Sequence, residues 1–391
     1  MKLIYLDNAS TTQVDERVLE KMLPFFMEKF ANPATKWTSS LSKEVDTYVE
    51  QARSDVANLI GAESDEIFFT SGGTESDNTA LKGVALANRE KGNEIISTKI
   101  EHEAILKPLE TLAEMGFSIK FVNTDKYGFF NPDEVKKLVS KKTILISIMH
   151  ANNEIGTIEP VEEIGKLAKE YEIYFHTDAV QTVGHLPINV KEMNVDLLSL
   201  SAHKFYGPKG VGAIYIRKGT RIEPFMEGGG QENGLRSGTL NTTGIIGLGE
   251  AAKIAKKEME LDDLKVKNIR NSLWKKIKEQ IPEVFLNGPE MDKRLSGNLN
   301  FLIKGIRNEP LLVSLNERGI IAGGGSACSA GSKEPSHVLK SIGINPEDYF
   351  SGIRMTIGKF NREEEIDTIV ENLKDCVNKL RELSPFWKEG E

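Results

Sequence analysis

Residues 196–204 are Asp196-Leu197-Leu198-Ser199-Leu200-Ser201-Ala202-His203-Lys204, a mostly apolar run that ends in polar and ionisable residues. Such a run predicts a β-strand covered on both faces, because a strand with one face in water would alternate apolar and polar side chains. Similar runs predict strands at residues 67–70, 94–98, 118–122, 143–149, 173–177 and 211–216.

Helical patterns lie between these runs. Residues 161–171, for example, follow Pro160 and carry apolar residues at Ile164, Leu167 and Ala168. The alternation predicts an α/β fold whose large domain has a mostly parallel seven-stranded sheet flanked by helices.

The pattern changes near residue 255. A long charged helical segment at 256–280 is followed by strands at 299–303 and 352–357 and by a closing helix at about 362–383. We therefore expect a large domain over residues 16–255 and a smaller α/β domain formed by residues 1–15 and 256–391.

The composition is typical of a soluble globular protein, with 39% hydrophobic and 28% charged residues in 391. The net charge of -8 argues against a nucleic-acid or anionic-membrane surface. Neither a bilayer-spanning run nor a signal peptide is recognisable, so the expected location is cytoplasmic. Two cysteines, Cys328 and Cys376, predict neither a disulfide framework nor a metal site. Cys376 lies in a helical pattern that predicts packing.

Polar residues follow five of the predicted strands. In a doubly wound sheet, ligands bind beyond the carboxyl ends of the strands, so these residues are candidates for one site. They are Ser71-Gly72-Gly73-Thr74-Glu75, His102, Asn152-Asn153-Glu154, Asp178 with Gln181, and Ser201-Ala202-His203-Lys204. Residues 70–76 either bind an anion at the start of a helix expected near Glu75 or form a plain strand-to-helix turn.

Lys204 follows an apolar strand, and the resulting desolvation would favour the neutral amine that forms an imine with an aldehyde. Asp178 ends a neighbouring strand. A lysine for an imine and a buried carboxylate for a pyridinium nitrogen form the pair that pyridoxal phosphate requires.

These motifs resemble those of the cysteine desulfurases, fold-type I pyridoxal-phosphate enzymes of the class-V aminotransferase family. The resemblance covers nearly the whole chain. The matching segments are Leu6-Asp7-Asn8-Ala9-Ser10-Thr11-Thr12, Asn32-Pro33, residues 69–76, Glu101-His102, residues 152–157, Asp178-Ala179-Val180-Gln181, Ser201-Ala202-His203-Lys204, residues 228–232 and 235–239, Gly325-Ser326-Ala327-Cys328 and Ile353-Arg354.

The resemblance implies a role for each matching residue around the cofactor. Lys204 would form the imine and move protons, and His102 would stack on the ring and assist acid–base steps. Asp178 would hold the pyridine nitrogen and Gln181 the phenolic oxygen. The residues implied for the phosphate are Gly73, Thr74, Ser201, His203 and, from the neighbouring subunit of a homodimer, Thr239.

The resemblance also implies that Asn153 and Arg354 bind the substrate carboxylate. Arginine suits this task because its planar fork can grip a carboxylate through two hydrogen bonds.

Cys328 lies in a stretch so rich in Gly, Ser and Ala that it predicts a mobile loop at about residues 322–334. Its thiol is either incidental or a nucleophile. The resemblance implies that it attacks the sulfur of L-cysteine and becomes a persulfide while L-alanine leaves. The sulfur would pass to an acceptor, such as an iron–sulfur scaffold protein, or serve tRNA thiolation or another thio-cofactor.

Two alternatives remain open at this point. One is selenocysteine lysis or another pyridoxal-phosphate reaction on the same scaffold, although a transaminase needs no thiol at Cys328. The other is a non-catalytic sulfur-relay partner, which the intact set of Lys204, Asp178, His102 and Arg354 disfavours.

Overall fold

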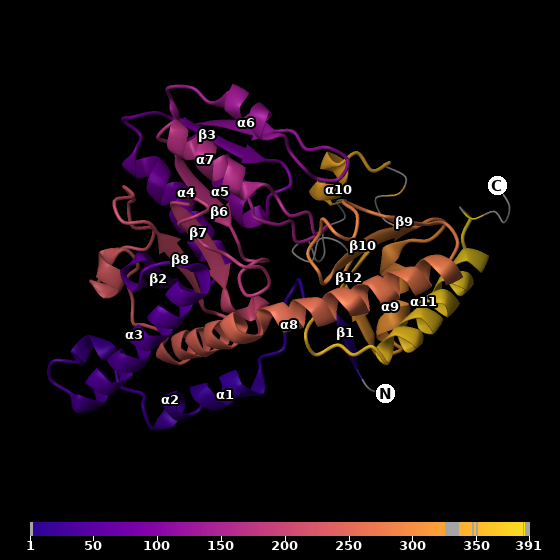
Figure 1. The fold of residues 1–391 in the computed structure, drawn as a ribbon, viewed down its shortest axis with the longest axis horizontal. Helices are drawn as coiled ribbons and strands as arrows, with labels where there is room; N and C mark the ends of the chain where they lie inside the picture. The colour runs from indigo at the N-terminus through magenta and orange to yellow at the C-terminus, as the bar shows by residue number, and fades with distance from the viewer. Residues whose placement is uncertain (1–2, 325–335, 346–347, 349–350, 386, 388–391) are drawn as a thin grey trace.

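The structure is a computed structural model that describes residues 3–324, 336–345, 348, 351–385 and 387. The two larger sheets, each backed by helices, lie side by side (Figure 1). The long helix α8 (Thr242–Gln280) runs past both of them. The chain thus has two packed cores that share one continuous helix.

The large sheet has seven strands in the order β2 (Ile67–Thr70), β8 (Gly212–Ile216), β7 (Leu197–Ser201), β6 (Tyr174–Asp178), β5 (Thr143–Ser147), β3 (Glu94–Thr98) and β4 (Ser118–Val122). Strand β8 is antiparallel to both of its neighbours, and the other pairs are parallel. The predicted mostly parallel seven-stranded sheet is confirmed.

Alternate residues of a central strand enter hydrophobic clusters on opposite faces of the large sheet. On β7, Leu198 and Leu200 join the cluster that includes Phe175, whereas Leu197 joins the cluster on the opposite face. Every residue of β5, β7 and β8 is buried, which is why these strands read as continuous apolar runs. The helices around this sheet are α3 (Ser40–Ile60), α4 (Gly73–Ala87), α5 (Glu103–Glu114), α6 (Pro132–Leu138), α7 (Val161–Glu170) and the first half of α8.

The second core surrounds an antiparallel sheet in the order β12 (Gly352–Thr356), β10 (Asn298–Ile303) and β9 (Val284–Leu286). The N-terminal strand β1 (Ile4–Leu6) pairs in parallel with β11 (Ile320–Ala322) beside it. Cys376 packs in this core at 1% exposure, as its helical pattern predicts. The remaining helices are α1 (Glu16–Met22), α2 (Pro24–Met27), α9 (Asn308–Asn316), α10 (His337–Ser341) and α11 (Glu365–Glu382).

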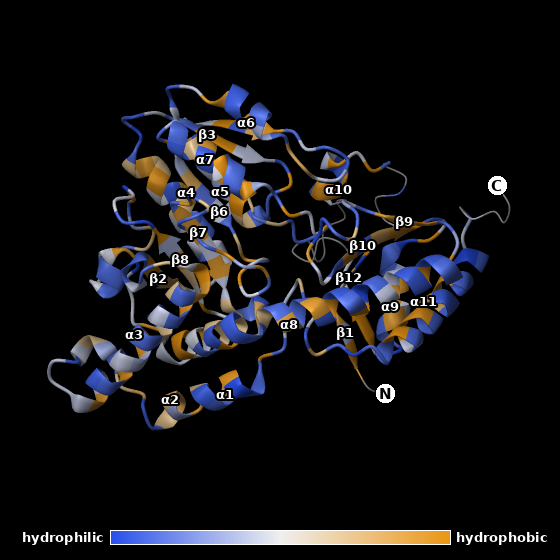
Figure 2. Cartoon of the chain, viewed as in Figure 1, coloured by the Kyte–Doolittle hydropathy of each residue, from blue (hydrophilic) through white to orange (hydrophobic). Residues whose placement is uncertain are grey.

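The distribution of apolar and polar residues agrees with this packing. Helix α11 presents hydrophilic residues outward (Figure 2) and buries Ile366, Ile369, Val370 and Leu373, as expected for a surface helix of a globular protein. Among the described residues, no helix combines the length and apolarity that crossing a membrane requires.

The predicted helix at 256–280 is too short at its N-terminal end, because α8 begins at Thr242. Its first turns contain Gly244, Gly247 and Gly249, residues that weaken a helical sequence pattern. At Gly249 the reason is close packing of α8 on α3, because a Cβ there would lie 2.5 Å from the Ala52 Cα. The proposed division into residues 16–255 and 1–15 with 256–391 would fall inside α8, and it stays a prediction.

Replacing Gly249 by Ala tests this close packing. Alanine is the better helix former, yet its methyl group would overlap Ala52, so we expect the free energy of unfolding to fall by about 1–2 kcal/mol. Urea denaturation measures the change. Gly230→Ala is the control, because a Cβ there meets nothing within 4 Å. A stabilised Gly249→Ala variant would contradict the packing argument.

Candidate active site

A cavity of about 340 Å³ opens at the carboxyl ends of the central strands, where a doubly wound sheet binds its ligands. Its volume suits a small-molecule site. Its lining residues come from both cores and are Ala9, Ser10, Gly73, Thr74, Asp77, His102, Met149, Ala151, Asn153, Asp178, Val180, Gln181, Ser201, His203, Lys204 and Arg354.

Lys204 reaches the cavity from the short 3-10 helix Ala202–Lys204, directly after β7. Its Nζ donates hydrogen bonds to the backbone carbonyls of Ala9 (2.5 Å) and Ser10 (2.8 Å). Its own carbonyl accepts one from His185 Nε2 at 2.8 Å. Hydrogen bonds therefore fix both the amine and the backbone carbonyl of Lys204, and the amine contacts the turn that follows β1.

The same turn binds other site residues. The Nε2 of Gln181 donates to the Ala9 carbonyl at 3.1 Å. The Nδ1 of His203 lies 3.0 Å from the Thr11 hydroxyl, and the carbonyl of His203 accepts from the Thr12 amide at 3.0 Å. Residues 7–12 thus tie the ends of β6 and β7 to the N-terminal strand.

Asp178 is the last residue of β6, and its carboxylate accepts a hydrogen bond from the Val180 amide at 2.9 Å. Burial raises the pKa of Asp178 to about 6, while the Val180 hydrogen bond and the charge of Lys204 oppose this shift. Asp77 of α4 also lines the cavity, and burial together with the charge of Asp178 raises the pKa of Asp77 well above its ordinary value. A cationic ring placed here would favour the ionised form of Asp178.

His102 is the N-cap of α5, and its Nδ1 accepts a hydrogen bond from the Ala104 amide at 3.1 Å. Burial lowers the pKa of His102 from 6.5 to about 4, and the nearby charge of Lys204 acts in the same direction. The imidazole is therefore neutral near pH 7, with its proton on Nε2.

The start of α4 forms part of the cavity wall and has the chemistry to bind an anion. Helix α4 begins at Gly73, slightly before the expected start near Glu75, so the amides of its first turn carry partial positive charge at the cavity. A Cβ on Gly73 would lie 2.6 Å from Val180 Cγ2, so only glycine lets the backbone approach this closely. Ser201 and His203 stand on the same cavity wall.

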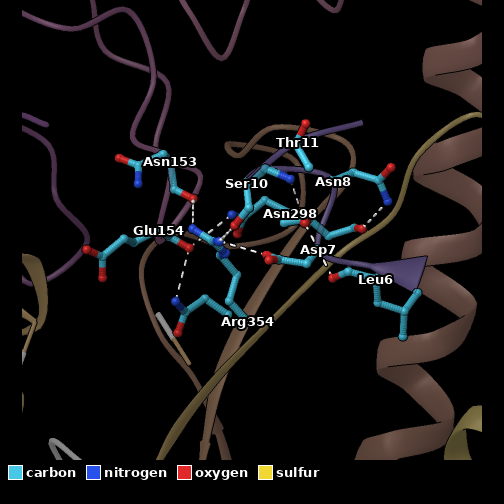
Figure 3. Close-up of polar contacts among 12 residues, drawn as sticks. Leu6, Asp7, Asn8, Ser10, Thr11, Asn153, Glu154, Asn298 and Arg354 are labelled. Atoms are coloured by element: carbon cyan, nitrogen blue, oxygen red, sulfur yellow. Dashed lines mark hydrogen bonds and ion pairs between the residues drawn. The ribbon is translucent and has the colours of Figure 1, made fainter. Parts of the chain in front are cut away.

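Arg354 enters from the second core, on β12, and its side chain is 1% exposed. Its Nη1 donates to the Asn153 carbonyl at 3.1 Å. Its Nη2 donates to Asp7 Oδ1 and to Ser10 Oγ, both at 2.8 Å (Figure 3). The guanidinium is therefore oriented by two separate chain segments, the turn at residues 7–12 and the loop that contains Asn153.

The structure brings the sequence-predicted residues together with two exceptions. Thr239 is exposed in the segment before α8 and does not line the cavity, and Cys328, with most of the predicted loop at 322–334, lies outside the described residues. The sequence reasoning assigned no role to Asp7, Ala9, Ser10 or Asp77. The signals available for the first three were the polar run after the short apolar segment 3–6 and the match of residues 6–12 to the cysteine desulfurases.

The lowered pKa of His102 predicts how the free energy of unfolding depends on pH. The unfolded chain takes up a proton near pH 6.5, whereas folded His102 does so only near pH 4, so stability falls as the pH drops through this window. His102→Asn keeps a helix-capping side chain. Between pH 7 and pH 5 we expect this variant to lose about 2 kcal/mol less unfolding free energy than the parent. Urea denaturation at both pH values measures this, and identical losses would contradict it.

Comparisons with known proteins show the family of this chain. The aminotransferase class-V family model matches residues 4–369. A protein named cysteine desulfurase IscS from Dictyoglomus turgidum is 50% identical over 386 residues, which are 99% of this chain and 97% of that protein. The protein of the same name from Methanosarcina thermophila is 47% identical and is matched over 98% of this chain and 94% of its own.

Solved structures show the same likeness. One described as a NifS-like protein has a TM-score of 0.90 and 38% identity, covering 97% of this chain and all of its own (100%). Another, SspA in complex with cysteine, has a TM-score of 0.81 and 35% identity, covering 92% and 99%. The chain therefore belongs to the aminotransferase class-V family and, within it, to the cysteine desulfurases.

Proposed function

We propose that this protein removes sulfur from L-cysteine to give L-alanine, with pyridoxal phosphate held on Lys204 and the sulfur received by Cys328. The observation that carries the proposal is the convergence of an amine, a buried carboxylate and a buried guanidinium on one cavity. These groups belong to Lys204, Asp178 and Arg354. The relatives named cysteine desulfurase support the choice of reaction.

The cavity residues fit pyridoxal phosphate. The backbone approach at Gly73 and the first turn of α4 suit a phosphate group. The Asp178 carboxylate accepts one hydrogen bond from Val180 among the described residues, so it retains acceptor capacity for a protonated ring nitrogen. Ser201, His203 and Thr74 would complete the phosphate contacts, Gln181 would donate to the phenolic oxygen, and His102 would stack on the ring.

Bound pyridoxal phosphate would supply an electron-withdrawing ring that stabilises negative charge at the substrate Cα. Arg354 and Asn153 would orient the substrate through its carboxylate. The amine of Lys204 would take the proton from Cα and later return one. Neutral His102 would serve as a second proton donor through its Nε2–H.

Cys328 would attack the substrate sulfur as a thiolate. The substrate carbon–sulfur bond breaks, its electron pair stays with the carbon, and protonation then completes alanine. The new sulfur–sulfur bond leaves a persulfide on Cys328, from which an acceptor such as an iron–sulfur scaffold protein would take the sulfur.

We further propose that the active protein is a homodimer in which Thr239 contacts the phosphate of the neighbouring subunit. The exposure of Thr239 outside its own cavity supports this arrangement.

Lys204→Ala tests the cofactor assignment. Without the amine, we expect the purified protein to lose the absorbance band of a lysine-bound cofactor and sulfide release to fall by a factor on the order of a thousand. Lys209→Ala, at an exposed lysine of the following loop, is the matched control and should retain both. A band that persists in Lys204→Ala would refute the assignment.

Cys328→Ser tests the sulfur acceptor within the chain. We expect the absorbance band to remain while sulfide release from cysteine falls by a factor on the order of a thousand, because serine cannot carry a persulfide. Mass spectrometry should find an added sulfur on Cys328 of the parent. Cys376→Ala, in the second core, is the control that should keep turnover. Unchanged turnover in Cys328→Ser would overturn the mechanism, and activity retained on selenocysteine alone would favour selenocysteine lysis.

A further inference from the structure

The hydrogen bonds of Arg354 leave few donors for a ligand. A guanidinium has five N–H donors. Both hydrogens of Nη2 are used, one by the Asp7 carboxylate and one by the Ser10 hydroxyl, and Nη1 donates to the Asn153 carbonyl. The Nε–H is buried and has no acceptor among the described residues.

This pattern matters because a carboxylate grips a guanidinium through two parallel hydrogen bonds. The two faces that permit such a grip are Nε with Nη2, and Nη1 with Nη2. Both include Nη2, whose hydrogens already go to Asp7 and Ser10 (Figure 3). A carboxylate that binds through two parallel hydrogen bonds must therefore share or displace one of these contacts.

Asp7 is also a carboxylate, and it is firmly held. Its backbone forms a β-bridge with Thr356, and its carbonyl accepts a hydrogen bond from the Tyr5 hydroxyl at 3.1 Å. A Cβ on Gly323 would lie 2.9 Å from Asp7 Oδ1, so the chain is closely packed around the ion pair on that side. Because Asp7 has little room to withdraw, its charge would stay next to a bound ligand.

We propose that Asp7 is a positioning residue that occupies Arg354 in place of the ligand carboxylate and so weakens the binding of amino acids at this site. The proposal rests on the proposed function, in which Arg354 binds the substrate carboxylate. Asp7 keeps the buried guanidinium charge-compensated and oriented before substrate arrives. It also lowers the affinity for every carboxylate ligand, including the product alanine, which aids product release.

The test measures equilibrium binding to the holoenzyme by isothermal titration calorimetry. L-Alanine carries a carboxylate and ethylamine does not, so the ratio of their dissociation constants reports recognition by Arg354. In Asp7→Asn the amide oxygen can still accept from Nη2, but the negative charge is gone. We expect L-alanine to bind about tenfold more tightly, as expected for removal of a like charge near the ligand, while ethylamine binding stays unchanged.

Two further variants test whether the charge of Asp7 causes the tighter binding of L-alanine. Ser10→Ala frees one Nη2 hydrogen without changing the charge, so L-alanine should bind only about threefold more tightly. Asp367→Asn makes the same chemical change on α11, at a side chain that is 71% exposed, and should leave both ligands unaffected. Damage to the fold would weaken binding, so tighter binding is a result that structural disruption does not produce.

Unchanged or weaker L-alanine binding in folded Asp7→Asn overturns the proposal. If that variant does not fold, unchanged or weaker binding in Ser10→Ala has the same consequence. Arg354→Gln separates this failure from failure of the proposed function. Loss of L-alanine affinity in Arg354→Gln without tightening in Asp7→Asn rejects the role of Asp7 alone, whereas unaltered affinity in Arg354→Gln rejects carboxylate binding by Arg354.

Discussion

The hydrogen bonds of residues 7–12 hold the active-site cavity together. This short turn receives the amine of Lys204 from the large sheet and the guanidinium of Arg354 from the small one. It also contacts His203 through Thr11. Most buried polar groups in proteins are paired, and each of these contacts fixes the position of a functional group as well as the path of the chain. The site depends on the N-terminal segment, although most of its side chains come from elsewhere.

Residues 7–12 can contact Lys204 and Arg354 at the same time because the two cores are packed together. Helix α8 contributes Leu248 to the first core and Leu273 to the second, so one continuous helix supports both. A second link joins Lys359 of the second core to Asp15, with the two side chains 7% and 6% exposed. The backbone amide of Lys359 also donates to the Tyr206 hydroxyl, two residues beyond Lys204. Lys204 and Arg354 therefore line one cavity that packing, and not a flexible linker, defines.

Burial shifts the pKa values of the acids and histidines of the site toward their neutral forms. Asp178 and Asp77 are held in the folded interior with raised pKa values, while burial lowers the pKa of His102 and of His203 to about 4. Among the described residues, the cationic side chains that line the cavity are those of Lys204 and Arg354, and Arg354 already forms an ion pair with Asp7. Such an interior is suited to a cationic ring and an anionic phosphate. The carboxylate of Asp178 would stabilise the ring, and the helix dipole of α4 would stabilise the phosphate.

The sequence by itself determined the seven strands of the large sheet, the order of the polar segments and the chemical types of the site. Runs such as residues 196–200 and 211–216 are local patterns, and a strand buried on both faces leaves an apolar run whatever its neighbours are. The positions of Lys204, Asp178 and His102 after such strands could therefore be predicted. Only the tertiary structure decided that α8 starts at Thr242 and that Asp7 pairs with Arg354, 347 residues away in the chain. Glycines that permit close helix packing look like helix breakers in a sequence, and an ion pair between distant segments leaves no local pattern, because it exists only once both cores have packed.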